Sequence, residues 1–291
     1  MNKNIFEEIT IVIVLYRESI DLLSECLKSI KGFKVIIIDN AYDKELKNEI
    51  EKKFQIYKYI LNKKNIGFSS ATNQGIKECD TKYILIHAAD CVISNKDIGI
   101  LLTSHQRYKG CFSTSPTFYN ESGKLTYTGG SSFESGRTNK PLELDGNVCV
   151  DAVITTTILF KKKDMEEIGL LDENFFLYFD DYDLCRTVKR HNKTVIQVYD
   201  AKALHSHGAI KVKNFFKKIF IRNYHFTFDE LYYFYKVRKH NDILMKLEKK
   251  IPNYLIKSLV NFFLFRFDKV VFYISIILGY LKFKKFLKKV N

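Results

Sequence analysis

The sequence has little of several residue types that mark common protein classes. Its 291 residues include no tryptophan and three prolines, and the six cysteines form no Cys-x-x-Cys pair. Neither a zinc ribbon nor a dense disulfide framework is therefore expected, and the thiols are predicted to be reduced and mostly buried. No Gly-x-x-x-x-Gly-Lys-Ser/Thr segment occurs, which excludes a P-loop.

Long apolar runs are also missing. The longest nearly uncharged stretch, residues 270–281, covers about a dozen residues, whereas a helix that spans a bilayer needs roughly 20. The chain opens with acidic residues, Glu7 and Glu8, where a signal peptide would be basic and then apolar. The sequence therefore predicts a cytoplasmic protein without a spanning helix.

The net charge of +14 lies in one part of the chain. Residues 1–210 contain 28 Lys plus Arg and 28 Asp plus Glu, whereas residues 211–291 contain 19 basic and 5 acidic residues interleaved with phenylalanines. We expect a neutral catalytic domain over residues 1–210 and a helical, basic and aromatic extension over residues 211–291. The extension is expected to bind an anionic membrane surface, and no nucleic acid. The alternative is a tail packed on its own domain or on a partner.

The first half of the chain alternates β-branched runs with amphipathic segments. We expect strands at residues 9–16, 34–39, 57–61 and 83–87, and helices at residues 21–30, 44–54 and 69–78. Runs such as residues 35–38 lack polar alternation, which suits strands covered on both faces. This pattern predicts an α/β fold with a largely parallel sheet, in which ligands bind at the carboxyl ends of the strands. Further on, a strand is expected at residues 151–160 and a short helix at residues 163–168.

Residues 169–186 combine acidic and aromatic side chains. Carboxylates beside an apolar wall are costly to ionise unless a metal, a base or a cation compensates them, which favours a functional cluster. Alternatively, Asp180, Asp181 and Asp183 complement the dipole of a helix that runs to about Arg190. Both interpretations can hold at once.

Several motifs follow one another in a recognisable order. They lie at residues 11–16, 36–40, 65–68, 73–75, 83–90, 169–186 and 203–205. This order resembles family 2 inverting glycosyltransferases with the GT-A fold, and among them bacterial rhamnosyltransferase-like enzymes of surface polysaccharide assembly. The resemblance covers about residues 9–225 and includes the pair Arg222 and Asn223. It implies a nucleotide-binding, mostly parallel central sheet flanked by helices.

The resemblance also implies a donor site. The donor-binding residues that it indicates are Tyr16, Arg17, Asp39, Asn65, Gly67, Asn73 and Asp90. Asp39 would contact the base or ribose of a nucleotide-sugar, because a carboxylate at a strand end accepts hydrogen bonds from ribose hydroxyls. Gly67 would permit a close backbone approach to the ligand.

A divalent metal is implied in the same way. Asp90 matches the last acid of the family's Asp-x-Asp motif, whereas Ala88 stands in place of the first. One carboxylate together with phosphate oxygens and waters can suffice for magnesium, and an imidazole ligand favours manganese over calcium. We therefore expect Mn²⁺ or Mg²⁺ on Asp90 and His205, with His207 as the competing ligand.

The resemblance assigns the general base to Asp181, which would take the proton from an acceptor hydroxyl. The residues expected to position the acceptor or the helix are Asp172, Glu173, Asp180, Asp183 and Arg186. Processive relatives carry a Gln-x-x-Arg-Trp motif, which a chain without tryptophan lacks. Transfer of one sugar, or a few, is therefore expected.

The reaction expected from the resemblance is inverting transfer from dTDP-rhamnose or a UDP-hexose to a saccharide, lipid-linked acceptor. The product would belong to bacterial O-antigen, capsule or lipooligosaccharide, made at the inner face of the membrane; an oligomer is compatible with this. One alternative is a nucleotidyltransferase, although residues 15–18 are not the Gly-rich loop that such an enzyme shows after its first strand. Another is a degenerate, non-catalytic membrane or nucleic-acid binding protein, since Ala88 removes one expected acid.

Overall fold

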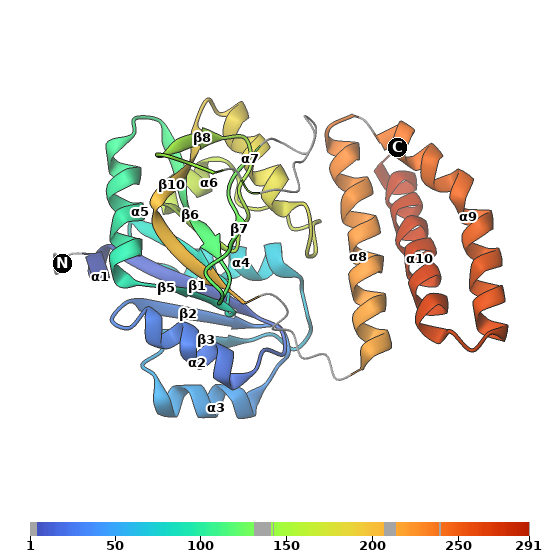
Figure 1. Ribbon diagram of the computed structural model, residues 1–291, viewed down its shortest axis with the longest axis horizontal. Coiled ribbons are helices and arrows are strands. Elements are labelled where there is room, and N and C mark those ends of the chain that lie inside the picture. Colours follow the sequence, from blue (N-terminus) through green and yellow to red (C-terminus); the bar gives the residue numbers. More distant parts are fainter. Residues whose placement is uncertain (1–4, 131–140, 142, 207–213, 239, 291) are drawn as a thin grey trace. The chain divides into compact units, whose positions relative to one another are not determined.

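The structure is a computed structural model that describes residues 5–130, 141, 143–206, 214–238 and 240–290 (Figure 1). Its contacts divide the chain into two compact units. The first unit comprises Met1–Glu173 and Asp180–Lys211, and the second comprises Asn174–Phe179 and Val212–Asn291. The short segment Asn174–Phe179 thus packs with the C-terminal helices, which the sequence did not indicate.

The first unit is built on one sheet. Its strands in the described residues are β1 Ile9–Leu15, β2 Lys34–Asp39, β3 Lys58–Leu61, β4 Tyr83–His87, β5 Cys91–Ile93, β6 Cys111–Tyr119, β7 Leu125–Tyr127, β8 Val148–Val150, β9 Thr157–Lys161 and β10 Thr194–His205. The spatial order is β3-β2-β1-β4-β9-β6-β10-β5, with β7 paired to β6 and β8 to β10. Strands β3, β2, β1 and β4 are parallel, whereas β9 runs antiparallel to both β4 and β6.

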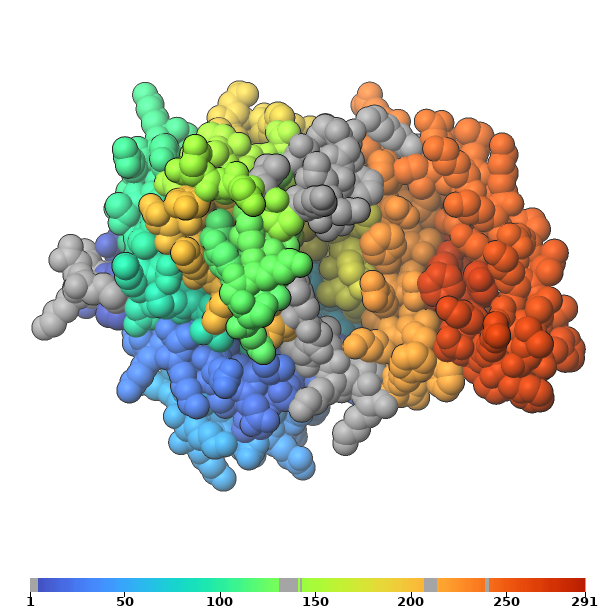
Figure 2. All heavy atoms as spheres, in the orientation of Figure 1, coloured from blue at the N-terminus to red at the C-terminus, as the bar shows by residue number. Residues whose placement is uncertain are grey.

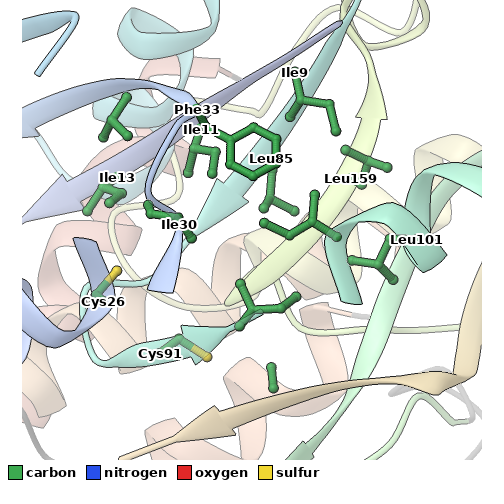
Figure 3. Packing of buried hydrophobic residues seen from close by; sticks show 14 of the residues in the cluster. Ile9, Ile11, Ile13, Cys26, Ile30, Phe33, Leu85, Cys91, Leu101 and Leu159 are labelled. Atoms are coloured by element: carbon green, nitrogen blue, oxygen red, sulfur yellow. The ribbon is translucent and has the colours of Figure 1, made fainter. Parts of the chain in front are cut away.

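Helices cover both faces of this sheet (Figure 1). They are α1 Ile5–Glu8, α2 Ile20–Ser29, α3 Lys44–Lys53, α4 Phe68–Glu78, α5 Asn95–Arg107, α6 Lys162–Glu167 and α7 Asp180–Arg190. Ile9, Ile11 and Ile13 of β1 are buried in a cluster with α2, α3 and α5, which Figure 3 shows from close by. Val12 faces the other way, into a cluster supplied by α4, α6 and α7. This alternation explains why a strand buried on both faces is apolar throughout.

The predicted α/β fold class is confirmed, and the four strands and three helices expected between residues 9 and 87 end within one or two residues of the expected positions. Strand β5 and helix α5, which follow them, were not predicted. The strand expected at residues 151–160 is shorter than predicted. Only Thr157–Lys161 is a strand, because Ala152 makes a single bridge to Gly130 and the Thr156 carbonyl accepts a hydrogen bond from Ala88 outside the ladder. The six cysteines are free, and five of them are buried as predicted; Cys149 is exposed.

In its described residues, the second unit contains three helices, α8 Phe215–Lys236, α9 His240–Phe263 and α10 Phe267–Val290. In α10, Ser275, Gly279 and Phe283 are buried. A Cβ atom on Gly279 would lie 2.6 Å from the carbonyl oxygen of Tyr224, so α10 and α8 approach closely at this glycine. Residues 270–281 therefore have one face packed within their own unit, as in the alternative considered for the tail. None of the described helices is long and apolar enough to cross a bilayer.

We predict that Gly75→Ala destabilises the protein. A Cβ atom at Gly75 in α4 would lie 2.4 Å from Cγ1 of Val12, a fully buried residue of β1. Overpacking of this kind costs about 1–3 kcal/mol. Gly99→Ala in α5 is the matched control, because its Cβ would meet only Ile5 at 3.5 Å, and alanine is favoured over glycine in a helix by about 1 kcal/mol. Urea denaturation of both variants measures the difference, and equal stabilities would contradict the packing described.

Candidate active site

The carboxyl ends of β1, β2 and β4 lie side by side at one edge of the sheet. β1 pairs in parallel with β2 on one side and with β4 on the other. The Asn40 N–H donates to the Leu15 carbonyl at 2.9 Å, which joins two of these strand ends. The segments that follow the three strands therefore meet where ligands bind in open α/β sheets.

Asp39 ends β2 and is 1% exposed. Its carboxylate accepts hydrogen bonds from the N–H groups of Ala41 at 2.6 Å and Asp43 at 3.0 Å, and from the Tyr59 hydroxyl at 3.3 Å. Burial raises the pKa of Asp39 above its usual value, against these three hydrogen bonds. The side chain thus fixes the turn after β2, and its contact with a nucleotide stays a prediction.

The loop between β3 and α4 is held next to Asp39 by amide side chains. Asn40 donates to the Gly67 carbonyl at 3.1 Å and accepts from Asn62 at 3.0 Å. The Gly67 N–H donates to the Asn65 side-chain oxygen at 2.9 Å. Gly67 has a φ of +90°, a conformation that favours glycine, and it directly precedes α4. Asn65 and Gly67 therefore give this loop a fixed shape beside the end of β2.

Asn73 of α4, another of the predicted donor-binding residues, forms hydrogen bonds within the protein. It is 2% exposed, and its amide forms hydrogen bonds with both the N–H (3.0 Å) and the carbonyl (2.8 Å) of Leu171. The same nitrogen donates to Glu173 at 3.1 Å. Asn73 thus ties α4 to the start of the acidic segment, and Glu173 also accepts from Ser70 at 3.4 Å. The expected donor contact of Asn73 stays a prediction, and the structure adds a positioning role.

Asp90 and His205 are brought together by the pairing of β5 with β10. His205 lies opposite Cys91 in this antiparallel pair, and the Ser206 N–H donates to the Asp90 carbonyl at 3.0 Å. The His205 Nε2 atom is 3.4 Å from Asp90 Oδ1, and the two side chains are 13% and 17% exposed. Two residues that are far apart in the sequence therefore form one partly open carboxylate and imidazole pair.

This pair fits a divalent cation. Two ligands that each lie about 2.1 Å from an ion, at a right angle, are about 3 Å apart, close to the observed separation. Among the residues that the structure describes, no group of three His, Cys, Asp or Glu side chains could hold a metal. The other ligands would therefore be phosphate oxygens and water, as expected from Ala88 in the first position of the motif. His207 lies outside the described residues.

Glu18 belongs to the same edge and was missed in the sequence. Its carboxylate accepts a hydrogen bond from the Tyr16 N–H. Burial raises the pKa of Glu18 to about 7, and the charges of Asp90 and Asp39 add to the increase. A carboxyl group with such a pKa is typical of functional sites. The sequence signal for it is an acidic residue three positions after the first strand, at the edge of the sheet where ligands bind.

Tyr16 and Arg17 lead from β1 to Glu18. Tyr16 is half-buried and Arg17 is exposed, with its guanidinium carbon 5.7 Å from the centre of the Tyr16 ring. Arg17 has a φ of +67°, a conformation that is uncommon for residues other than glycine and recurs at functional sites. Both side chains lie at the edge where the donor was expected.

The acidic segment begins α7. Asp180 is 5% exposed and accepts a hydrogen bond from the Thr155 hydroxyl at 3.0 Å, whereas Asp183 is 6% exposed. Asp181 is half-buried, and its carboxylate accepts from the Tyr182 N–H at 2.8 Å. The acids at the helix start complement its dipole, which confirms that interpretation. Of these three carboxylates, that of Asp181 is the most exposed to solvent.

Three further residues complete the expected acceptor side. Glu173 is exposed, and Asp172 and Arg186 are half-buried. Arg186 lies in α7, and Asp172 lies between Leu171 and Glu173, to both of which Asn73 forms hydrogen bonds. Their roles toward an acceptor stay predictions.

Comparison with known proteins decides the family. The sequence model described as Glycosyl transferase family 2 matches residues 10–169, more than half of the chain. The chain belongs to glycosyltransferase family 2. The match spans β1 to α6 and therefore includes Asp39, Asp90 and the loop around Gly67. A relative of this chain, the low-salt glycan biosynthesis hexosyltransferase Agl10 of Haloferax volcanii, is 24% identical over 216 residues, which cover 71% of this chain and 69% of Agl10.

Solved structures show the same GT-A fold. GalNAc-T7, crystallised with UDP, GalNAc and Mn²⁺, aligns with a TM-score of 0.58 at 14% identity, over 70% of this chain and 44% of its own. This glycosyltransferase thus spans less than half the length of GalNAc-T7. The mannosyltransferase PcManGT of Pyrobaculum calidifontis, in complex with GDP-Man and Mn²⁺, aligns with a TM-score of 0.52 at 10% identity, over 95% of this chain and 86% of its own.

We predict that Glu18→Gln gains stability relative to the wild type as the pH rises. Because burial raises the pKa of Glu18 from 4.5 to about 7, the stability contributed by its bound proton is full below pH 4.5 and is lost as the pH rises through about 7. Glutamine does not titrate. The difference in free energy of unfolding should therefore change by about 1–3 kcal/mol between roughly pH 4.5 and pH 8.

Urea denaturation in the presence of EDTA measures this difference without interference from a bound metal. Glu25→Gln, an exposed acid in α2, serves as the control and should show no such change. A Glu18→Gln difference that is the same at both pH values would contradict the raised pKa of Glu18.

Proposed function

We propose that this glycosyltransferase transfers a sugar from a nucleotide-sugar to a saccharide acceptor with inversion at the anomeric carbon. The observation that carries the proposal is the meeting of Asp39, Glu18, Asp90 and His205 at one edge of the sheet. GalNAc-T7 and PcManGT, which share the fold, were solved with UDP or GDP-Man and Mn²⁺. These complexes support a nucleoside diphosphate and a divalent cation as the ligands that bind at this edge of the sheet.

The proposed donor is dTDP-rhamnose or a UDP-hexose. Agl10 is a hexosyltransferase of glycan biosynthesis, which supports a hexose-type donor and a glycan product. We assign the product to a bacterial surface polysaccharide such as O-antigen, capsule or lipooligosaccharide, with a lipid-linked acceptor. This assignment rests on the order of motifs from residue 11 to residue 205.

Donor binding is assigned to the residues around the strand ends. Asp39 accepts three hydrogen bonds within the protein, and it would accept one from the ribose or base through its remaining lone-pair position. Asp90 and His205 would hold Mn²⁺ or Mg²⁺, which when bound offsets the negative charge that develops on the leaving diphosphate. Gly67, without a side chain, lets the loop backbone approach the donor.

Asp181 is the proposed general base. It accepts the proton of the acceptor hydroxyl while that oxygen attacks the anomeric carbon and the bond to the diphosphate breaks. The neighbouring acids are less suited, because Asp180 is buried against Thr155 and Asp183 is also buried. A single displacement of this kind inverts the anomeric configuration and needs no second nucleophilic carboxylate.

We further propose that the second unit binds an anionic membrane through an exposed apolar surface at the α9–α10 corner. The residues of this corner are Leu255, Ile256, Leu259, Val260, Phe262, Phe263, Leu264, Phe265 and Phe267. Phe265 is 79% exposed and Phe263 is 69% exposed. Contiguous exposed apolar patches of this kind mark interaction sites. The atoms of the neighbouring helices α9 and α10 are drawn in orange and red in Figure 2.

The charges beside the corner indicate which partner covers it. Lys257, Arg266 and Lys269 are exposed within or next to it, and residues 255–267 contain no acid. Each basic residue near an anionic surface contributes about 1 kcal/mol, and insertion of apolar side chains adds to this. A lipid surface with negative headgroups matches both features, and it is where a lipid-linked acceptor would reside.

Asp181→Asn should abolish transfer and leave donor binding intact. Loss of a general base lowers kcat by about 100-fold to 10,000-fold, while the side chain keeps its size. Transfer assays with dTDP-rhamnose and UDP-hexoses measure kcat, and calorimetry measures nucleotide affinity. Asp200→Asn, an exposed acid of β10, is the control with wild-type turnover. Retained turnover of Asp181→Asn would reject this base.

The double variant Phe263→Ser with Phe265→Ser should lose membrane binding. Each buried phenylalanine contributes about 1.5–3 kcal/mol, so we expect binding to phosphatidylcholine vesicles with about 30% phosphatidylglycerol to fall at least about tenfold. Vesicle flotation measures it, with Tyr57→Ser, an exposed aromatic residue of the first unit, as the control. If the wild type does not float but forms dimers that the double variant lacks, the corner is an interface between copies instead.

A further inference from the structure

Asp229 of α8 holds the backbone of the segment Asn174–Phe179. The carboxylate is 0% exposed. It accepts hydrogen bonds from three consecutive N–H groups, those of Phe176 at 3.2 Å, Leu177 at 3.0 Å and Tyr178 at 3.0 Å. These residues lie in neither a helix nor a strand, so no ladder would otherwise satisfy their donors. One buried side chain therefore replaces secondary structure for this segment.

The same side of α8 supplies the side-chain contacts of the segment. Residues spaced three, four and seven apart lie on one face of a helix, as 225, 229 and 232 do here. The His225 ring stacks on Phe176 with centroids 3.6 Å apart, and the Tyr232 ring contacts Phe175 at 4.9 Å. The Asn174 amide donates to the Tyr232 hydroxyl at 3.1 Å. The face is thus built around this segment along its length.

The remaining aromatic residues of the segment contact the neighbouring positions of α8. Tyr178 and Phe179 both meet the Phe226 ring, with centroids 5.3 Å and 5.4 Å away, and Phe179 also meets Tyr233 at 5.6 Å. Phe179 has a φ of +65°, and the next residue begins α7. The residue that directly precedes Asp180 in the chain is therefore held by α8.

We propose that Asp229 is a positioning residue for sugar transfer. It fixes the backbone of residues 176–178, and this in turn orients Asp181, a few residues further along the chain, for catalysis. The proposal rests on the proposed function, in which Asp181 is the base. It assigns the C-terminal helices a part in the reaction itself, in addition to membrane binding. A lost Asp229 carboxylate would leave three backbone donors without an acceptor.

The charged groups around Asp229 permit a direct measurement of this role. Burial raises the pKa of Asp229 to about 6, against the three backbone hydrogen bonds and the positive charge of Lys282 on α10. Burial, together with the charge of Lys282, lowers the pKa of His225 to about 3, so this ring stays neutral above that pH. Burial raises the pKa of Tyr178, against the charge of Arg222. Burial also raises the pKa of the adjacent Glu230, against the charge of Lys250. It is Asp229, however, that accepts the hydrogen bonds of these amides.

The experiment compares Asp229→Asn with the wild type. We expect kcat to fall at least about tenfold while donor KM and nucleotide affinity stay within about twofold, because the donor site lies in the other unit. In the wild type, the amide proton shifts of Phe176, Leu177 and Tyr178 should move together with a midpoint near pH 6, and in the variant they should not. Glu230→Gln, the adjacent acid on α8, is the matched control with wild-type kcat and the same titration as the wild type.

The outcomes distinguish a failure of the proposed function from a failure of the positioning role of Asp229. A wild type that transfers no sugar from any nucleotide-sugar would reject the proposed function, and the proposal with it. An active wild type with an equally active Asp229→Asn variant would overturn the positioning role alone, as would a variant whose nucleotide affinity falls as much as its kcat. If Asp229→Asn does not fold, Asp229→Glu keeps a carboxylate but shifts it by one methylene from the three N–H groups that it accepts from; an unchanged kcat in that variant would overturn the proposal.

Discussion

The parallel pairing of β1 with both β2 and β4 is the constraint on which the rest of the structure depends. It places the chain after Leu15, after Asp39 and after His87 at one edge of the sheet. The three strands are apolar because helices cover both faces of the sheet. The polar residues that follow these strands therefore lie partly buried at the edge of the sheet. The raised pKa values of Glu18 and Asp39 are the electrostatic consequence of that burial.

The antiparallel strands of the sheet bring a histidine to the edge that the parallel strands form. Antiparallel pairing of β5 with β10 brings the His205 imidazole next to the Asp90 carboxylate, at an edge where Ala88 has no polar side chain. The Thr155 hydroxyl anchors Asp180 at the start of α7, and α8 holds the residues just before it. The predicted donor-binding residues and the predicted base thus depend on different elements of the fold.

The sequence predicted the elements with strong local signals. Apolar runs such as residues 35–38 located the strands of the first half, and the order of short motifs indicated the family and the fold. The roles of Asp39, Asp90, Asp181 and His205 stay predictions that the geometry supports. Glu18 and Asp229 could not be found in this way, because their properties arise from burial and from contacts between residues more than 50 positions apart. The packed face of α10 was hidden for the same reason.

The most direct test of a metal-dependent donor site is calorimetric titration of UDP, dTDP and GDP into the wild type and Asp90→Ala, with and without Mn²⁺. We expect one nucleotide to bind tightly to the wild type in the presence of Mn²⁺, and removal of the ion or of the Asp90 carboxylate to weaken this binding at least about tenfold. Nucleotide binding of equal strength without the ion and in Asp90→Ala would contradict a metal-dependent site.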